Sequence, residues 1–110
     1  MDTTQAANAM DALGAAVRLE IYRMLVRAGE QGMNIGRLQQ KTSIPRSTLA
    51  HHIHRLIDGG LVSTEKSGAS LICRADYAAM NQLVGFLSDE CCADEDLESL
   101  QRSTEGEGAA

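Results

Sequence analysis

The sequence contains no tryptophan and one phenylalanine among its 110 residues. A core without large aromatic rings must be built from Leu, Ile, Val, Met and Ala, which suits packed helices better than a β-sandwich. The apolar fraction of 44% is ordinary for a globular chain, and the length corresponds to one domain. We therefore expect a single, mainly helical domain with a modest core.

Long apolar runs are also missing, and the opening segment MDTTQAANAMDALG lacks the basic start of a signal peptide. We expect no transmembrane span, no membrane partner and a cytoplasmic location. Three cysteines are an odd number, which is a poor basis for a disulfide framework, and thiols stay reduced in the cytoplasm. A phosphate-binding glycine loop is absent and no His–carboxylate pair stands beside a nucleophile, so we do not expect an enzyme.

The net charge of −5 is unevenly distributed along the chain. Residues 16–75 carry nine bases and four acids, a balance of +5, whereas residues 76–110 carry one base and nine acids, a balance of −8. A basic middle with an acidic flank is typical of a chain that binds a polyanion. An ordinary solvated surface is the alternative, and charge alone does not decide between them.

Apolar residues recur at helical spacing in the first half of the chain. The pattern predicts a helix over 4–13, with Ala6, Ala9, Met10 and Leu13 on one side, and a helix over 15–28 that stops at Gly29. The apolar positions of this second helix are 17, 21, 24, 25 and 28.

Two further helices follow around a short turn. Asn34 is expected to cap a helix over 35–42 whose main apolar contact is Leu38. Pro45 suits the first turn of the next helix, which ends at Gly59 and Gly60. Its inward positions are Leu49, Ile53, Leu56 and Ile57.

The rest of the chain predicts a hairpin, a helix and a tail. LVSTEK and ASLICR flank Ser67-Gly68, which indicates a β-hairpin. A last helix begins near Asp76, and its apolar stripe has the heptad spacing of a helix that pairs with another helix. That stripe comprises Tyr77, Met80, Val84, Leu87 and Cys91. From Ala93 the chain is acidic, so we expect a domain over 1–92 and a disordered tail over 93–110.

This order of elements is that of a winged helix-turn-helix domain, mainly α with a small β-hairpin (ααααββα), with the fourth helix as the recognition helix. Its outward positions suit phosphate and base-edge contacts. A merely solvated face is the alternative. The DNA-binding residues predicted there are Arg46, Ser47, Thr48, His51 and Arg55.

The other histidines of this helix are expected to have different roles. His52 lies three residues after Leu49 and four before Leu56, so it leans towards the core as a hydrogen-bonded packing residue. His54 is expected to be solvated. His51 and His54 are three residues apart, a spacing too weak to predict a zinc site.

The segments ALGAAVRLEIYRML, IPRSTLAHHIHRLIDGGLV and ICRADYAAMNQLVGFLSDECC resemble the ArsR/SmtB family of bacterial winged-helix repressors over residues 6–92. The resemblance implies a homodimer through the first and last helices, a palindromic double-stranded operator, and release from it by an inducer. Family DNA contacts carry over to Ser47, Thr48 and His51, with Arg46 and Arg55 less directly. Ala50 stands where many members have Ser.

Two inducer sites of the family are missing here. The helix NIGRLQQKTS has none of the cysteines of arsenic and cadmium sensors, and residues 76–92 contain no His of the zinc-sensing type. The last segment instead resembles a branch whose final helix ends in a cysteine pair. Thiolates select soft metals and metalloids, so the resemblance predicts a metalloid site at Cys91 and Cys92, with As(III), Sb(III) or a trivalent organoarsenical as inducer and no required cofactor.

Several questions about this site and about the partner of the domain stay open in the sequence. Cys91 also fits the apolar stripe as a small hydrophobe, and a thiol-redox or persulfide switch would use the same two sulfurs. A winged helix that binds proteins instead of DNA is a further alternative. Cys73 is too far along the chain to reach the pair of its own subunit, so we expect it to join the site only across an antiparallel dimer.

Overall fold

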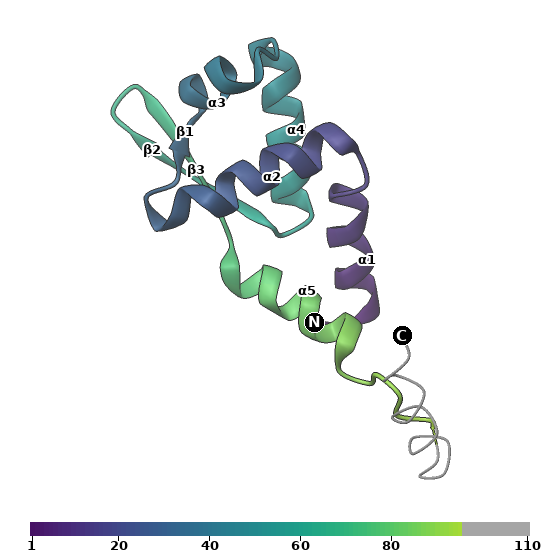
Figure 1. Cartoon of the computed structure of the whole chain (residues 1–110). Helices are drawn as coiled ribbons and strands as arrows, with labels where there is room; N and C mark the ends of the chain where they lie inside the picture. Colours follow the sequence, from purple (N-terminus) through teal and green to yellow (C-terminus); the bar gives the residue numbers. More distant parts are fainter. Residues whose placement is uncertain (96–110) are drawn as a thin grey trace, which may run out of the picture.

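A computed structural model describes residues 1–95 of the chain, and Figure 1 shows its helices and strands. They follow one another as α1 (Thr3–Ala12), α2 (Ala16–Ala28), the 3-10 turn η1 (Gly29–Gln31), β1 (Met33–Asn34), α3 (Ile35–Thr42), α4 (Arg46–Asp58), β2 (Val62–Ser67), β3 (Ser70–Ala75) and α5 (Tyr77–Ser88). This is a mainly α winged helix-turn-helix with a small antiparallel wing, as the sequence predicts. The expected disorder of the tail falls, from residue 96 on, outside the described residues.

The helix-turn-helix consists of α3 and α4, and its boundaries follow from local chemistry. The Asn34 side chain accepts a hydrogen bond of 2.7 Å from the backbone N–H of Arg37, so it caps α3 as predicted. Ser43 ends α3 in the left-handed region with φ 57. Pro45 was predicted in the first turn of α4, but it is the N-cap, and the helix begins at the next residue, Arg46. The turn between the two helices is therefore three residues long, 43–45.

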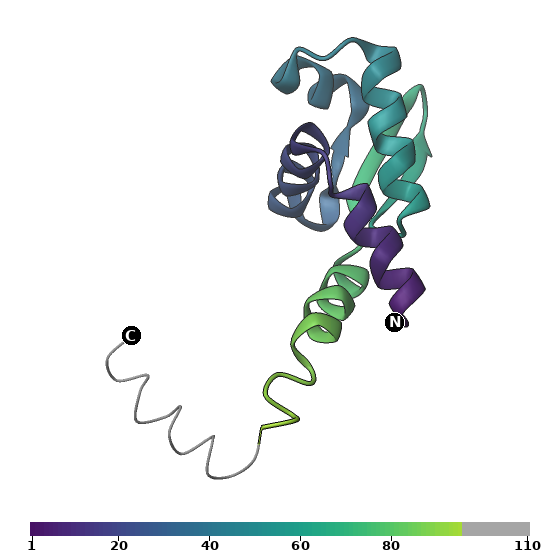
Figure 2. The same cartoon turned by 90° about the vertical axis from the view of Figure 1, so that its right-hand side faces the viewer.

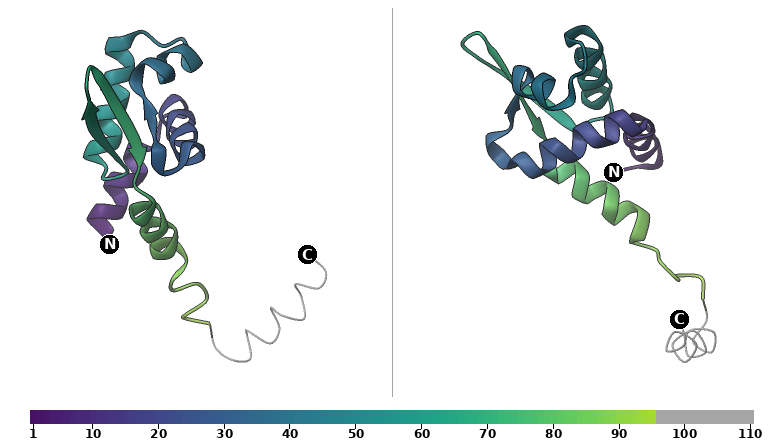
Figure 3. Two further views of the ribbon diagram at one scale, coloured as in Figure 1. Left: turned by 90° about the vertical axis from the view of Figure 1, so that its left-hand side faces the viewer. Right: turned by 45° about the horizontal axis from the view of Figure 1, so that its top comes forward.

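The wing is larger than the predicted hairpin. β2 and β3 pair antiparallel around a tight turn in which Gly68 has φ 61, and β1 pairs with the other edge of β3, giving the order β1-β3-β2. β1 was missed because a two-residue strand leaves no alternating pattern to detect. The hairpin tip projects beyond the helices (Figure 3), and β2 is exposed from Ser63 to Ser67.

The core lies between the helices and β3, and it is aliphatic as expected. Its largest fully buried side chains are Ile21, Leu25, Leu38, Leu49, Leu56, Leu61 and Cys73. Two predicted inward residues are exposed instead: Met10 is 43% exposed and Val17 45%. The buried face of α1 consists of small residues, Ala6, Ala9 and Ala12, and at Ala12 the backbone of Gly59 approaches closely.

α5 carries part of the predicted stripe on an open face. Met80 is half-buried and Leu83 is buried, whereas Val84 and Leu87 are 60% and 61% exposed. α1 and α5 leave the body of the domain on the same side (Figure 2). An exposed apolar stripe on one of two neighbouring helices is what a pairing surface requires.

The prediction that α5 extends to the cysteine pair is wrong. The helix ends at Ser88, so Cys91 is not the last member of its stripe. The Ser88 hydroxyl donates back to the Val84 carbonyl at 2.9 Å, a bond that weakens helices. The last turn has no basic residue, and the carboxylates of Asp89 and Glu90 oppose the helix dipole at this end.

No helix within residues 1–95 is long and apolar enough to cross a membrane.

Candidate DNA interface and thiol site

The N-terminal end of α4 is an open polar surface. Arg46, Ser47, Thr48 and His51 are all exposed, and no side chain caps this end of the helix. The first backbone N–H groups of an α-helix have no partner within the helix, and with the helix dipole they favour an anion. Four of the five predicted DNA-binding residues therefore lie together where phosphates and base edges can be contacted.

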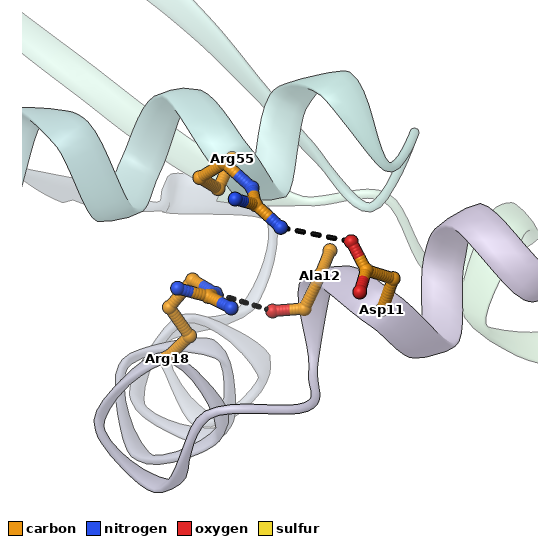
Figure 4. A network of polar contacts seen from close by, with 4 residues as sticks. All are labelled: Asp11, Ala12, Arg18 and Arg55. Carbon is orange, nitrogen blue, oxygen red and sulfur yellow. Dashed lines mark hydrogen bonds and ion pairs between the residues drawn. The ribbon is translucent and has the colours of Figure 1, made fainter.

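Arg55, the fifth predicted residue, lies elsewhere. Its Nη2 is 2.8 Å from Oδ2 of Asp11 on α1, and its side chain is 39% exposed (Figure 4). The guanidinium is thus engaged within the protein, at the end of α4 that packs on α1. The sequence did not indicate Asp11 as a partner, because the two residues are 44 positions apart.

Lys66 on the wing is a candidate that the sequence prediction missed. It lies on the exposed part of β2, close to the projecting tip. Its neighbour Glu65 is in an ion pair with Arg74, at 2.9 Å between Oε1 and Nη1. The sequence did contain a signal for this residue, because Lys66 is a basic residue next to the predicted hairpin turn.

His52 is half-buried, but the hydrogen bond predicted for it is missing at Nδ1. That atom is buried and has no partner. Burial, then the nearby charges of Arg18 and His51, lower the pKa of His52 below its ordinary value of 6.5. His54 is solvated as expected, with Nε2 3.8 Å from Oδ2 of Asp58.

His52 predicts a loss of stability in mild acid. Because its pKa is lower in the fold than in the unfolded chain, the unfolded chain takes up the proton first. The stabilisation is present above about pH 6.5 and declines as the pH falls below that value. Urea unfolding at pH 7.5, 6.5 and 5.5, at one protein concentration, should give a smaller decline for His52→Gln than for wild type. His54→Gln should decline like wild type, and equal slopes for His52→Gln and wild type would contradict the prediction.

The cysteine pair forms a compact exposed site in the turns that follow α5. The backbone N–H of Cys91 donates to the Ser88 carbonyl at 3.0 Å, and that of Glu95 donates to the Cys92 carbonyl at 3.1 Å. Cys92 has φ 62, in the left-handed region, and the two Sγ atoms are 3.7 Å apart. Both thiols are free and exposed.

The environment of the pair keeps Cys92 protonated. A hydrogen bond with Cys91, the charge of Cys91 and then the carboxylate of Glu95 raise the pKa of Cys92 to about 11. A chemistry that needs a free thiolate at neutral pH is therefore disfavoured at Cys92. Reactions that begin from the protonated thiol are not disfavoured.

Cys73 does not lie near solvent. It is fully buried in the middle strand of the sheet, where it pairs with Met33 on one side and Thr64 on the other. Burial raises its thiol pKa. This position conflicts with the prediction that Cys73 faces the partner's thiol pair, because a core side chain reaches a subunit interface only if the sheet opens. Within residues 1–95, no group of three or more His, Cys, Asp or Glu residues is arranged to hold a metal ion.

Comparison with known proteins finds similarity to helix-turn-helix proteins in sequence and in fold. A helix-turn-helix domain model matches residues 13–65. The chain is 27% identical over 88 residues to the HTH-type transcriptional regulator YgaV of Escherichia coli strain K12, covering 80% of this chain and 87% of that protein.

Solved structures extend the similarity over nearly all the described residues. An ArsR-like transcriptional regulator from Rhodococcus sp. RHA1 is 23% identical with a TM-score of 0.70, covering 96% of this chain and 93% of that one. The transcriptional repressor BigR from Xylella fastidiosa is 29% identical with a TM-score of 0.61, over 81% and 88%. A homodimeric winged helix-turn-helix DNA-binding domain from Mycobacterium bovis is 22% identical with a TM-score of 0.64, over 80% and 82%.

Proposed function

We propose that the chain is a helix-turn-helix transcriptional regulator of the ArsR family, and a repressor released from its operator when a trivalent arsenical binds Cys91 and Cys92. The carrying observation is the pair of exposed free thiols with Sγ atoms 3.7 Å apart. A metal–thiolate bond is about 2.3 Å long, so one atom bonded to both sulfurs needs them within roughly 4.6 Å of each other.

The repressor binds DNA through the N-terminal half of α4. Ser47 and Thr48 offer hydroxyls beside the free N–H groups of the first turn, and His51 follows one turn later. Arg46 offers a guanidinium to a phosphate or a guanine edge. The projecting wing adds Lys66, whose ammonium suits the backbone phosphates beside the groove.

Replacing Arg46 tests this interface. Arg46→Gln should lower operator affinity and reduce the slope of log affinity against log salt by about one, because one phosphate contact is lost. Fluorescence anisotropy with a labelled duplex at several salt concentrations measures both quantities. The matched control is Arg46→Lys, which keeps the positive charge at the same position and should therefore keep the wild-type salt slope. A salt slope equal to that of wild type would remove Arg46 from the phosphate contacts.

The active form is a homodimer that pairs through α1 and α5. Val84 and Leu87 are exposed on α5, and an apolar hollow of about 360 Å³ is lined by Leu13, Leu19, Tyr22, Val26 and Met80, with Arg23 and Arg27. Burying these apolar surfaces against a second copy would stabilise the pair. The similar M. bovis domain is homodimeric, which supports a dimer here. A two-fold dimer recognises a palindromic operator.

The number of sulfurs favours organic arsenicals over inorganic arsenite. A trivalent arsenical with one carbon substituent has two exchangeable positions, and the exposed pair supplies two thiols. Each As–OH group condenses with one S–H, forming an As–S bond and releasing one water, so two protonated thiols give a dithiolate and two waters. No thiolate is required, which suits the raised pKa of Cys92. Arsenite accepts a third sulfur, and Cys73 is buried.

A titration of the DNA complex tests the proposal against its alternatives. The operator is a duplex selected from a random-sequence library by the wild-type protein, and anisotropy follows its release. Phenylarsine oxide should release it at one equivalent per subunit, arsenite and antimonite at higher concentrations, and cadmium or zinc not at all. Release by polysulfide alone would establish a persulfide sensor instead. Failure to select any duplex would point to a protein-binding winged helix.

A further inference from the structure

Arg55 lies at the opposite end of α4 from the other residues predicted to bind DNA. It is nine positions after Arg46, which corresponds to about 13 Å along the helix axis. Its side chain is part-buried, whereas those of Arg46, Ser47 and Thr48 are exposed. The two ends of the recognition helix therefore have different environments, one open to solvent and one packed on α1.

The packed end of α4 meets α1 at two points. At Gly59, a Cβ would lie 2.6 Å from Cβ of Ala12 and 3.2 Å from the Asn8 carbonyl, so the backbone after α4 rests directly on α1. One turn earlier, Arg55 makes its 2.8 Å contact with Asp11. Beside the buried residues of α4, these two contacts with α1, spaced one turn apart, constrain the angle between the two helices more than either contact would alone.

The end of α1 that receives these contacts is itself held in place. Nε of Arg18 on α2 donates to the Ala12 carbonyl at 2.7 Å (Figure 4), and the N–H of Gly14 donates to the Asp11 carbonyl at 3.1 Å. Asp11 is thus presented from a fixed turn. The other ion pairs seen within residues 1–95 are more local: His54–Asp58 lies within α4, and Arg74–Glu65 joins neighbouring strands.

We propose that Arg55 and Asp11 are a positioning pair that sets the angle of the recognition helix relative to α1, and with it the separation of the two recognition helices in the dimer. Arg55 is then not a DNA-binding residue. The inference rests on the proposed function, because it requires a dimer that binds an operator through α4. Helix-turn-helix dimers read half-sites about 34 Å apart, and a tilt of about 10° at the packed end moves Arg46 by roughly 2 Å.

The test uses Arg55→Gln, Asp11→Asn and the double variant on the duplex selected by the wild-type protein. A second set of duplexes changes the spacing between its half-sites one base pair at a time. Each single variant should lose affinity about 3- to 10-fold, and the double variant should lose no more than either single one. The preference for one spacing should become flatter, and the salt slope should stay at the wild-type value. The charge exchange Asp11→Arg with Arg55→Asp should restore both affinity and spacing preference.

A DNA-contacting Arg55 gives a different pattern. Arg55→Gln would then reduce the salt slope by about one, and Asp11→Asn would bind as well as wild type or better, because a competing carboxylate is gone. That pattern overturns the inference, as does an unchanged spacing preference in both single variants. An exposed ion pair adds little to folding stability, so melting curves of the variants should match wild type. Wild-type protein that selects no duplex overturns the proposed function and this inference together, whereas normal wild-type binding with unaltered variants overturns this inference alone.

Discussion

Replacing Cys92 by Ser should raise the concentration of phenylarsine oxide needed for operator release by about 100-fold or more. The second As–S bond forms within the same molecule, at a high effective concentration of thiol, and the variant loses that advantage. The hydroxyl of Ser fills nearly the same exposed space, so operator affinity without arsenical should stay within about twofold of wild type. Cys91→Ser should give the same result. Anisotropy titration of the preformed complex measures both quantities.

Cys73 supplies the matched control for this experiment. Cys73→Ala should leave arsenical release unchanged while lowering stability, because Cys73 is fully buried in β3. Ala is preferred to Ser here, since a hydroxyl without a partner in the core carries its own penalty. If folded Cys73→Ala protein binds the operator but no longer responds to phenylarsine oxide, then a third sulfur belongs to the site and the two-thiol proposal is wrong.

Gly32→Ala should destabilise the protein by about 3 to 5 kcal/mol, which combines backbone strain with overpacking. Gly32 has φ 69 and ψ −164, a conformation that is essentially restricted to glycine. An added Cβ would lie 2.5 Å from the Cys73 carbonyl oxygen and 2.7 Å from Cγ of Arg74. The close approach brings the residue between η1 and β1 directly against β3, the middle strand of the sheet.

Gly29 separates the two causes. Its backbone has φ 76 and ψ −164, almost the same as Gly32, but a Cβ there would meet nothing within 4 Å. Gly29→Ala therefore carries the backbone strain alone, about 1 to 3 kcal/mol. Urea unfolding of both variants at equal protein concentration gives the difference. Equal losses at the two positions would show that the contact with β3 relaxes without cost.

The fold was predictable from sequence because its determinants are local. Asn34 and Asp76 were expected to cap helices, and each side chain accepts a hydrogen bond from the N–H three residues later. Leu49, Ile53 and Leu56 were expected to face inward from α4, and all three are buried. Capping and helical spacing depend on residues only a few positions apart, and such local patterns can be recognised in a single sequence.

The sequence was least informative where the outcome depends on distant residues or on competing weak effects. It did not indicate that Arg55 contacts Asp11, 44 positions away, or that Cys73 is buried in the middle strand of the sheet. The stripe through Cys91 was extrapolated past Ser88, where acidic residues oppose a helix C-terminus. Each of these cases concerns a candidate site residue, whose role depends more on its neighbours than on its spacing.

The thiol pair lies in consecutive turns and consists of adjacent residues, so its geometry owes little to the packed core. Under the proposed function, affinity for the arsenical would be a property of a short stretch of chain, and the folded dimer would contribute the response. A sensor divided in this way can gain or lose a sulfur without any change in the surface that reads DNA. The identity of the inducer and the identity of the regulated genes are thereby free to evolve separately.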